Sequence, residues 1–170
     1  KNIDELKEKI KYLREITGGK PILLKLGAGN IENDIELAVY SNPDIIVVDG
    51  MEGGTGAAPE VLLDDMGIPT INALVRARKK MDELDAKQEL IMGGNFSKGA
   101  DVAKALALGA DAVIMGFPLL IAMGCTYCTL CHLGKCHKGI TTQEEVLRKK
   151  FDIEKNAENA ANFILSCTEE

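Results

Sequence analysis

The hydrophobic and polar positions along this chain follow two alternating spacings. In residues 2–16, apolar side chains recur every three or four positions with charged residues between them, which predicts a helix with one buried face. Residues 21–26 form an apolar run with one lysine, bounded by glycines, which predicts a strand buried on both faces. The alternation continues, with strands predicted over 44–49, 69–72, 89–92 and 111–115 and helices over 31–42, 74–84, about 98–108, 142–150 and 155–166.

The strand–helix repeat predicts an α/β fold. Five consecutive units spaced by 20 to 24 residues indicate a parallel sheet with right-handed crossovers. A doubly wound, flavodoxin-like sheet and part of a TIM (β/α)8 barrel both fit this repeat. Glycine follows strand after strand here, at Gly27, Gly50, Gly93 and Gly116, whereas a doubly wound nucleotide fold concentrates glycine after its first strand. We therefore predict a partial barrel of about five parallel strands with helices.

One domain is expected, because the length suits a single core and there is no low-complexity linker. Residues 1–124 would form the C-terminal part of a barrel, residues 125–143 a cysteine-rich loop, and residues 144–170 C-terminal helices. The chain begins at Lys1 inside a helical pattern and has no signal-peptide pattern, which indicates a processed chain or a piece of something longer. A barrel piece without its first three strands should be poorly stable alone, because its sheet edges are exposed.

Charge and composition narrow the expected partners. A net charge of −6 argues against nucleic acid or an anionic membrane as the main partner. No apolar run approaches the roughly 20 residues that cross a bilayer. The thiols are gathered in one segment beside an ordinary apolar core, which favours a reducing, cytoplasmic setting over a disulfide scaffold.

Four of the five cysteines lie between Cys125 and Cys136, separated by two, two and four residues. Disulfides, a zinc site and an iron–sulfur cluster are the alternatives for so dense a group. A zinc site usually has two separated pairs, although His132 and His137 could join one. The spacing is closer to a ferredoxin run, so an iron–sulfur cluster is the favoured interpretation. Cys167 stands apart and is expected to be a small, half-buried residue.

The ends of two predicted strands indicate an anion site. Gly93-Gly94 and Gly116-Phe117 each open a helix, so free backbone N–H groups there can bind a cofactor phosphate. Barrels often bind phosphate after their last two strands. The alternative is that these glycines only permit tight turns.

Two further strand ends carry charged residues. The glycine-rich loop over residues 50–59 holds Glu52, Gly53, Gly54 and Thr55, which favours a ligand loop over a flexible turn. Lys25 lies near the end of an apolar strand, where it needs an anion or carbonyl partner unless it extends into solvent.

The chain resembles the FMN domain of glutamate synthase. Four segments carry the resemblance: Lys25-Leu26, residues 49–59, Gly93-Gly94 and residues 125–143. The resemblance is strongest to the compact archaeal-type, ferredoxin-linked form, and it corresponds to about strands four to eight of that barrel. It implies two cofactors, FMN and an iron–sulfur cluster of [3Fe–4S] type held by Cys125, Cys131 and Cys136. Cys128 is then an extra thiol, which brings [4Fe–4S] into consideration.

The resemblance also implies an oxidoreductase that reduces 2-iminoglutarate, formed from 2-oxoglutarate and ammonia, to L-glutamate. Ammonia would come from a glutaminase domain or subunit, and electrons from a donor protein or ferredoxin-like domain. Lys25 and Glu52 are the implied catalytic residues, and FMN would contact Lys25, Gly53, Gly54, Thr55, Gly93, Gly94, Gly116 and Phe117. The rival hypotheses are another FMN-barrel oxidoreductase, a non-catalytic electron-transfer fragment that carries the cluster, and a zinc-stabilised binding module.

Overall fold

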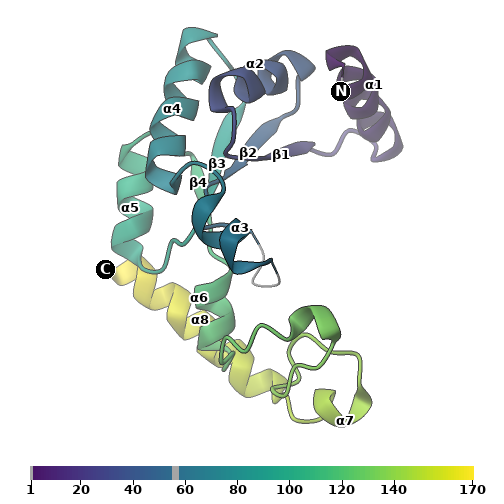
Figure 1. Cartoon of the computed structure of the whole chain (residues 1–170), viewed down its shortest axis with the longest axis vertical. Coiled ribbons are helices and arrows are strands. Elements are labelled where there is room, and N and C mark those ends of the chain that lie inside the picture. Colours follow the sequence, from purple (N-terminus) through teal and green to yellow (C-terminus); the bar gives the residue numbers. More distant parts are fainter. Residues whose placement is uncertain (1, 55–57) are drawn as a thin grey trace.

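The chain folds around a parallel sheet, seen here in a computed structural model that describes residues 2–54 and 58–170. The described strands are β1 (Leu23–Gly27), β2 (Ile45–Asp49), β3 (Glu89–Gly93) and β4 (Ala112–Ile114). They lie in the order β1-β2-β3-β4 (Figure 1). A doubly wound sheet reverses its strand order at a switch point, and this order contains no reversal. The fold is therefore a partial (β/α)8 barrel, as the sequence predicted.

Helices follow each strand along the chain. The described helices are α1 (Ile3–Ile16), α2 (Ile31–Ser41), α3 (Glu60–Asp65), α4 (Thr70–Glu83), α5 (Gly99–Ala107), α6 (Phe117–Ala122), α7 (Glu145–Arg148) and α8 (Ile153–Glu169), with a short 3-10 helix over Cys131–Leu133. The predictions for 142–150 and 155–166 correspond to α7, which is shorter, and α8, which is longer.

The core lies between the sheet and the helices α2 and α4. Ile46 and Val48 of β2 are fully buried, as are Leu74 and Met81 of α4. Successive strand residues point to opposite faces, so these strand residues face the helices while their neighbours face the other side.

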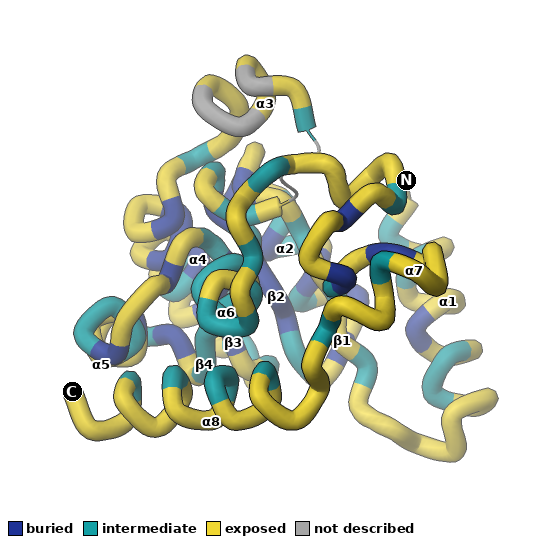
Figure 2. The backbone as a smooth tube through the Cα atoms, turned by 90° about the horizontal axis from the view of Figure 1, so that it is seen from below, coloured by how far each residue is buried: buried dark blue, intermediate teal, exposed yellow. Residues whose placement is uncertain are grey.

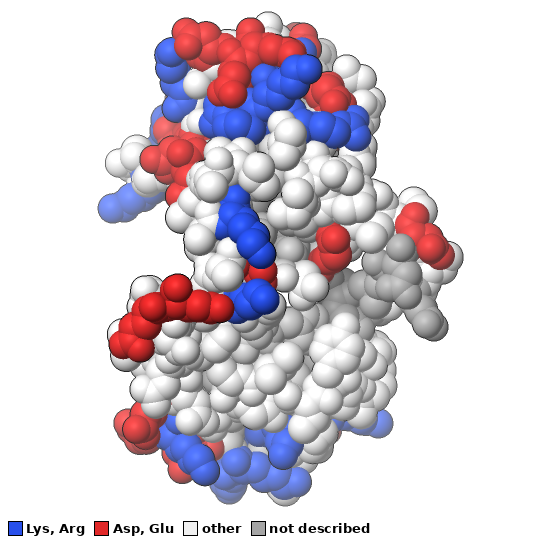
Figure 3. All heavy atoms as spheres, turned by 90° about the vertical axis from the view of Figure 1, so that its left-hand side faces the viewer, with Lys and Arg blue, Asp and Glu red and all other residues white. Residues whose placement is uncertain are grey.

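Figure 3 shows charged side chains of both signs intermixed at the end of the molecule where α4 ends. Two ion pairs join α4 to α2 on the solvent side, Arg76–Glu32 and Lys80–Glu36, both with N–O distances of 2.6 Å.

The prediction of a strand over residues 69–72 is wrong, and the sheet has four described strands rather than five. Thr70 begins α4 directly after Pro69, whose φ of −51° suits a helix entry. Ala73, Leu74, Ala77 and Met81 are the buried positions of this helix, whereas Ile71 is 47% exposed. The apolar residues of 69–72 therefore belong to the first turn of a helix, and the β2–β3 connection contains both α3 and α4.

The helix α8 packs along α5 and α6 and joins the C-terminal segment to the barrel (Figure 1). Its outer side is exposed over most of its length (Figure 2). The carboxylate of Glu170 accepts a hydrogen bond of 2.9 Å from the backbone N–H of Gly99, at the first residue of α5. A carboxylate at a helix N-terminus satisfies a free donor and favours the helix dipole.

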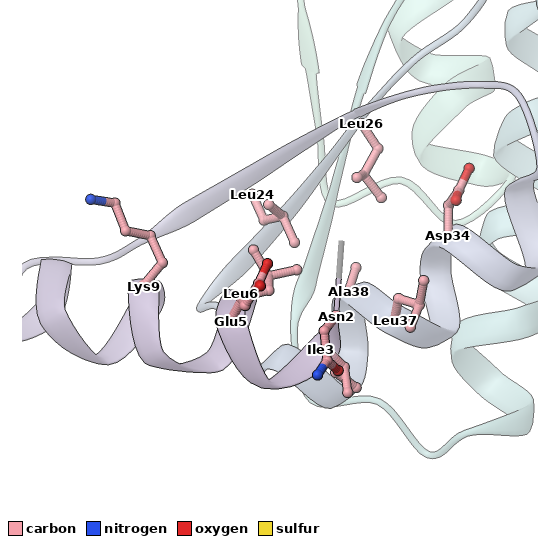
Figure 4. A pocket seen from close by; sticks show the side chains of 10 residues that line it. All are labelled: Asn2, Ile3, Glu5, Leu6, Lys9, Leu24, Leu26, Asp34, Leu37 and Ala38. Atoms are coloured by element: carbon pink, nitrogen blue, oxygen red, sulfur yellow. The ribbon is translucent and has the colours of Figure 1, made fainter.

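The strand β1 is an edge of the sheet among the described residues. On its outer side, Leu24 and Leu26 gather with Leu6 of α1 and Leu37 of α2 around a cavity of about 350 Å³ (Figure 4). On its inner side, Leu23 is 52% exposed. Apolar side chains therefore remain uncovered at this edge, as expected for part of a barrel.

Candidate functional site

A large cavity lies at the carboxyl ends of the strands. The parallel register aligns Gly27 with Asp49 and Asp49 with Gly93, so these strand ends lie side by side. Alternation along the strands places Lys25, Asp49 and Gly93 on the face opposite the core helices. The cavity measures about 860 Å³, and its lining includes the predicted residues Lys25, Glu52, Gly53, Gly54, Gly93, Gly94, Gly116 and Phe117. Thr55 lies outside the described residues.

Lys25 and Asp49 form an ion pair inside this cavity. The Lys25 Nζ lies 2.6 Å from Asp49 Oδ2, and the two side chains are 57% and 17% exposed. The lysine therefore has an anionic partner, as the sequence predicted, and still presents its ammonium group to the cavity. The strand itself is not buried on both faces as predicted, because β1 is an edge strand of partly exposed residues. Sequence reasoning missed Asp49, although a carboxylate that ends an apolar strand is the same kind of signal.

Glu52 joins the glycine-rich loop to the start of α4. Its carboxylate accepts hydrogen bonds from the Thr70 backbone N–H at 2.8 Å and from the Thr70 hydroxyl at 2.6 Å. Burial raises the pKa of Glu52, but the two Thr70 hydrogen bonds outweigh it, and the net effect is a lowered pKa. Glu52 thus caps α4 from a distant part of the sequence while it also lines the cavity.

Two glycines of the site differ in what surrounds them. A Cβ at Gly94, which has a φ of +131°, would overlap the Thr70 hydroxyl, so internal packing already requires a glycine there. A Cβ at Gly116 would meet no atom of the described residues within 4 Å, and Gly116 lines the cavity. Contacts within the described protein therefore do not require a glycine at position 116. A bound group that approaches this backbone closely would require one.

A second, smaller cavity holds the thiols. It measures about 290 Å³, and Cys125, Cys128, Cys131 and Cys136 all line it. All four are free thiols, so the disulfide alternative has no support among them. Within residues 2–54 and 58–170, no three His, Cys, Asp or Glu side chains are already grouped closely enough to hold a metal ion.

Backbone groups form hydrogen bonds to two of these sulfur atoms. Burial raises the pKa of the Cys136 thiol, but hydrogen bonds from the backbone of Thr141, Ile140 and Lys138 outweigh it and lower the pKa to about 7. The backbone N–H of Tyr127 donates to the Cys125 Sγ at 3.4 Å. Thiolates are the form that binds metals, and N–H donors to sulfur tune iron–sulfur clusters. The donor set of this cavity therefore fits an iron–sulfur cluster.

The two cavities adjoin one another. Gly54, Gly116, Phe117 and Tyr127 line both of them. The structure also adds Asn95, Ser97, Ile121 and Phe163 to the strand-end cavity. Phe163 comes from α8, and no local pattern in the sequence indicates that this helix reaches the cavity.

The fold and the cavities define a class: a (β/α)8-barrel protein with a ligand cavity at its strand ends and a thiol-lined cavity beside it. The family described as a conserved region in glutamate synthase matches residues 1–170. An archaeal glutamate synthase (NADPH) from Archaeoglobus fulgidus is 41% identical over 99% of this chain. An archaeal-type glutamate synthase (NADPH) from Thermotoga maritima is 40% identical over 96% of this chain. The chain belongs to the glutamate synthase family, which confirms the predicted resemblance.

The chain spans about a third of the length of these relatives, 34% and 33% respectively. A solved structure of a single-residue variant of FabK from Thermotoga maritima aligns with a TM-score of 0.53 and 21% identity, over 69% of this chain and 34% of that one. Identity this low shows a shared fold alone. Across the part of the chain that the structure describes, no helix is both long and apolar enough to cross a membrane.

Proposed function

We propose that this chain is the part of a glutamate synthase that binds FMN and an iron–sulfur cluster and reduces 2-iminoglutarate to L-glutamate. The observation that carries the proposal is the pair of adjoining cavities. One contains a lysine and strand-end glycines, and the other is lined by four cysteines, with Gly116 and Phe117 in the wall of both.

The overall reaction balances in two steps. Ammonia condenses with the ketone of 2-oxoglutarate and releases water to give 2-iminoglutarate. Two electrons and two protons then convert the imine to the amine of L-glutamate. Bound FMN would supply the chemistry of the second step, because a flavin can accept electrons singly and deliver them as a hydride. The electrons would come from an external reduced donor protein or ferredoxin-like domain through the cluster, and the ammonia from a glutaminase domain or subunit.

The residues of the strand-end cavity have separate parts in this proposal. Gly93, Gly94, Gly116 and Phe117 would hold the FMN phosphate, while Gly53, Gly54 and Thr55 would lie against the flavin. Lys25 would hold a substrate carboxylate or the negative charge of the reduced flavin, because its ammonium group faces the cavity. We retain Glu52 as a proposed catalytic residue, and its bonds to Thr70 would fix the glycine-rich loop against the cavity.

The residues of the second cavity would hold the cluster. Cys125, Cys131 and Cys136 are the proposed ligands of a [3Fe–4S] cluster, and Cys128 lines the same cavity as the fourth ligand that a [4Fe–4S] cluster would need. The backbone donors to Cys125 and Cys136 would stabilise these sulfurs as thiolates.

The test is anaerobic purification of the full-length protein with iron, sulfide and flavin quantified. We expect one FMN and one cluster per chain, and turnover of 2-oxoglutarate and ammonia with a reduced donor. Cys131→Ser should lose the cluster, whereas Cys167→Ser, outside the thiol cavity, should retain it. Well-folded protein that holds no flavin, iron or sulfide would overturn the proposal. Zinc in place of iron would favour a zinc-stabilised binding module instead.

A further inference from the structure

An aromatic pair stands between the two cavities. The rings of Phe117 and Tyr127 have their centroids 4.7 Å apart with an interplanar angle of 56°, a tilted contact that aromatic rings favour. Both residues line the strand-end cavity, and both also line the thiol cavity. Tyr127 is 54% exposed, so much of the residue is not covered by the rest of the described chain.

The backbone at Tyr127 adopts a conformation that a bulky aromatic residue rarely takes. Its φ is +54°, in the left-handed region that favours glycine. This turn directs the Tyr127 N–H to the Cys125 Sγ at 3.4 Å and places the Tyr127 ring against Phe117. Residues held in such conformations are often found at functional sites. Tyr127 therefore connects a proposed cluster ligand directly to the wall of the strand-end cavity.

We propose that Phe117 and Tyr127 form a partition that closes the thiol cavity against the strand-end cavity. The partition would let substrate and water enter the strand-end cavity without reaching the sulfur atoms from that side, and the Tyr127 backbone would hold Cys125 in place. In the proposed enzyme it would lower the exposure of the cluster to solvent, which is one of the factors that set a cluster's reduction potential. In this respect the inference rests on the proposed function.

The test compares Tyr127→Leu with Tyr127→Phe in the anaerobically purified, cofactor-loaded, full-length protein. Leucine retains an apolar side chain and a Cβ at the same φ but removes the ring, whereas phenylalanine retains the ring. After exposure to air, we expect the visible absorbance of the cluster to bleach several-fold faster in Tyr127→Leu than in the wild type. The cluster potential should become more positive in Tyr127→Leu, and Tyr127→Phe should match the wild type in both measurements.

A second measurement does not depend on any cofactor. In metal-free protein, iodoacetamide should alkylate Cys125 several-fold faster in Tyr127→Leu than in the wild type, with Cys167 as the internal reference in mass spectrometry. If Tyr127→Leu does not fold, Phe117→Leu removes the other ring of the pair. It should speed the alkylation of Cys125 to a similar extent. Equal alkylation rates in all folded variants would overturn the partition. A wild-type protein without iron or flavin would overturn the proposed function, while alkylation would still decide the partition.

Discussion

At the scale of single residues, Lys25 should contribute little to stability although it lines the strand-end cavity. Its ion pair with Asp49 joins a lysine side chain that is 57% exposed to a carboxylate that is 17% exposed. Because the lysine of this pair is well exposed to solvent, the pair should contribute only about 0–1 kcal/mol to stability. We expect Lys25→Gln to change the free energy of unfolding by about 1 kcal/mol or less. Turnover should fall by about a hundredfold or more, because a charge-stabilising donor is lost. Denaturant titration and steady-state kinetics would check this, and unchanged turnover would contradict a catalytic role.

Glu52 should affect stability in a way that depends on pH. Its hydrogen bonds to Thr70 cap α4, and removing such a cap costs about 1 kcal/mol. We expect Glu52→Gln to lose about that much at neutral pH. The pKa of Glu52 is lowered in the folded state, so its contribution is complete above 4.5, the ordinary pKa of a glutamate, and is lost as the pH falls through the folded-state pKa. The difference in unfolding free energy between wild type and variant should therefore shrink in acid.

A double-mutant cycle with Thr70→Val would isolate this contact from other effects of the Glu52 change. The expected result is a coupling energy of about 0.5–1.5 kcal/mol between Glu52 and Thr70 at neutral pH. Additive effects of the two substitutions would show that the bond from the Thr70 hydroxyl contributes nothing, so that any cap comes from the bond with the Thr70 backbone N–H alone.

At the scale of elements, the loops after β3 and β4 use glycine for different reasons. Gly94→Ala would bring a Cβ against the Thr70 hydroxyl at a φ of +131°. We expect it to destabilise the protein by about 1–3 kcal/mol. In Gly116→Ala the new Cβ would meet no atom within 4 Å in the part of the chain that the structure describes, so the variant should fold normally and instead weaken FMN binding. Thermal unfolding and flavin content, measured on both variants, would check the contrast. Normal flavin content in Gly116→Ala would contradict a close approach of FMN at this position.

The predicted elements were right wherever a local pattern agreed with the tertiary contacts. The apolar runs at β1, β2, β3 and β4 became strands because each pairs in parallel with a neighbouring strand of the sheet. The segment 69–72 was misassigned because Thr70 starts a helix whose cap, Glu52, lies 18 residues earlier. No short window of sequence contains both partners of that contact.

At the scale of the whole molecule, the sheet has open edges. The described strands β1 and β4 each have a neighbour on one side, and Leu23 and Ile114 are 52% and 42% exposed. Unpaired edges with apolar neighbours favour association with other chains. Residues 1–170 expressed alone should therefore self-associate, whereas the full-length protein should not associate through this sheet. Sedimentation velocity of both would check this, and a stable monomer of the 170 residues would contradict it.

The sequence by itself determined the class of fold and the family, and it marked the places where we propose that chemistry is concentrated. Apolar periodicity defined the strand–helix repeat, and glycines and charges marked the strand ends, because those signals are local. Cys125 to Cys136 stood out for the same reason, as four thiols in one short segment. These are properties of neighbouring residues along the chain, so they can be read without knowing how distant segments meet.

Only the tertiary structure decided how these parts act on one another. It placed Asp49 beside Lys25, brought Phe163 of α8 into the cavity, and set Glu52 on Thr70. It also put Phe117 against Tyr127 in the wall between two cavities. Each of these contacts joins segments that are separated along the chain, and each depends on strand register and helix packing. A linear pattern does not encode such geometry, because it arises only when the sheet is assembled.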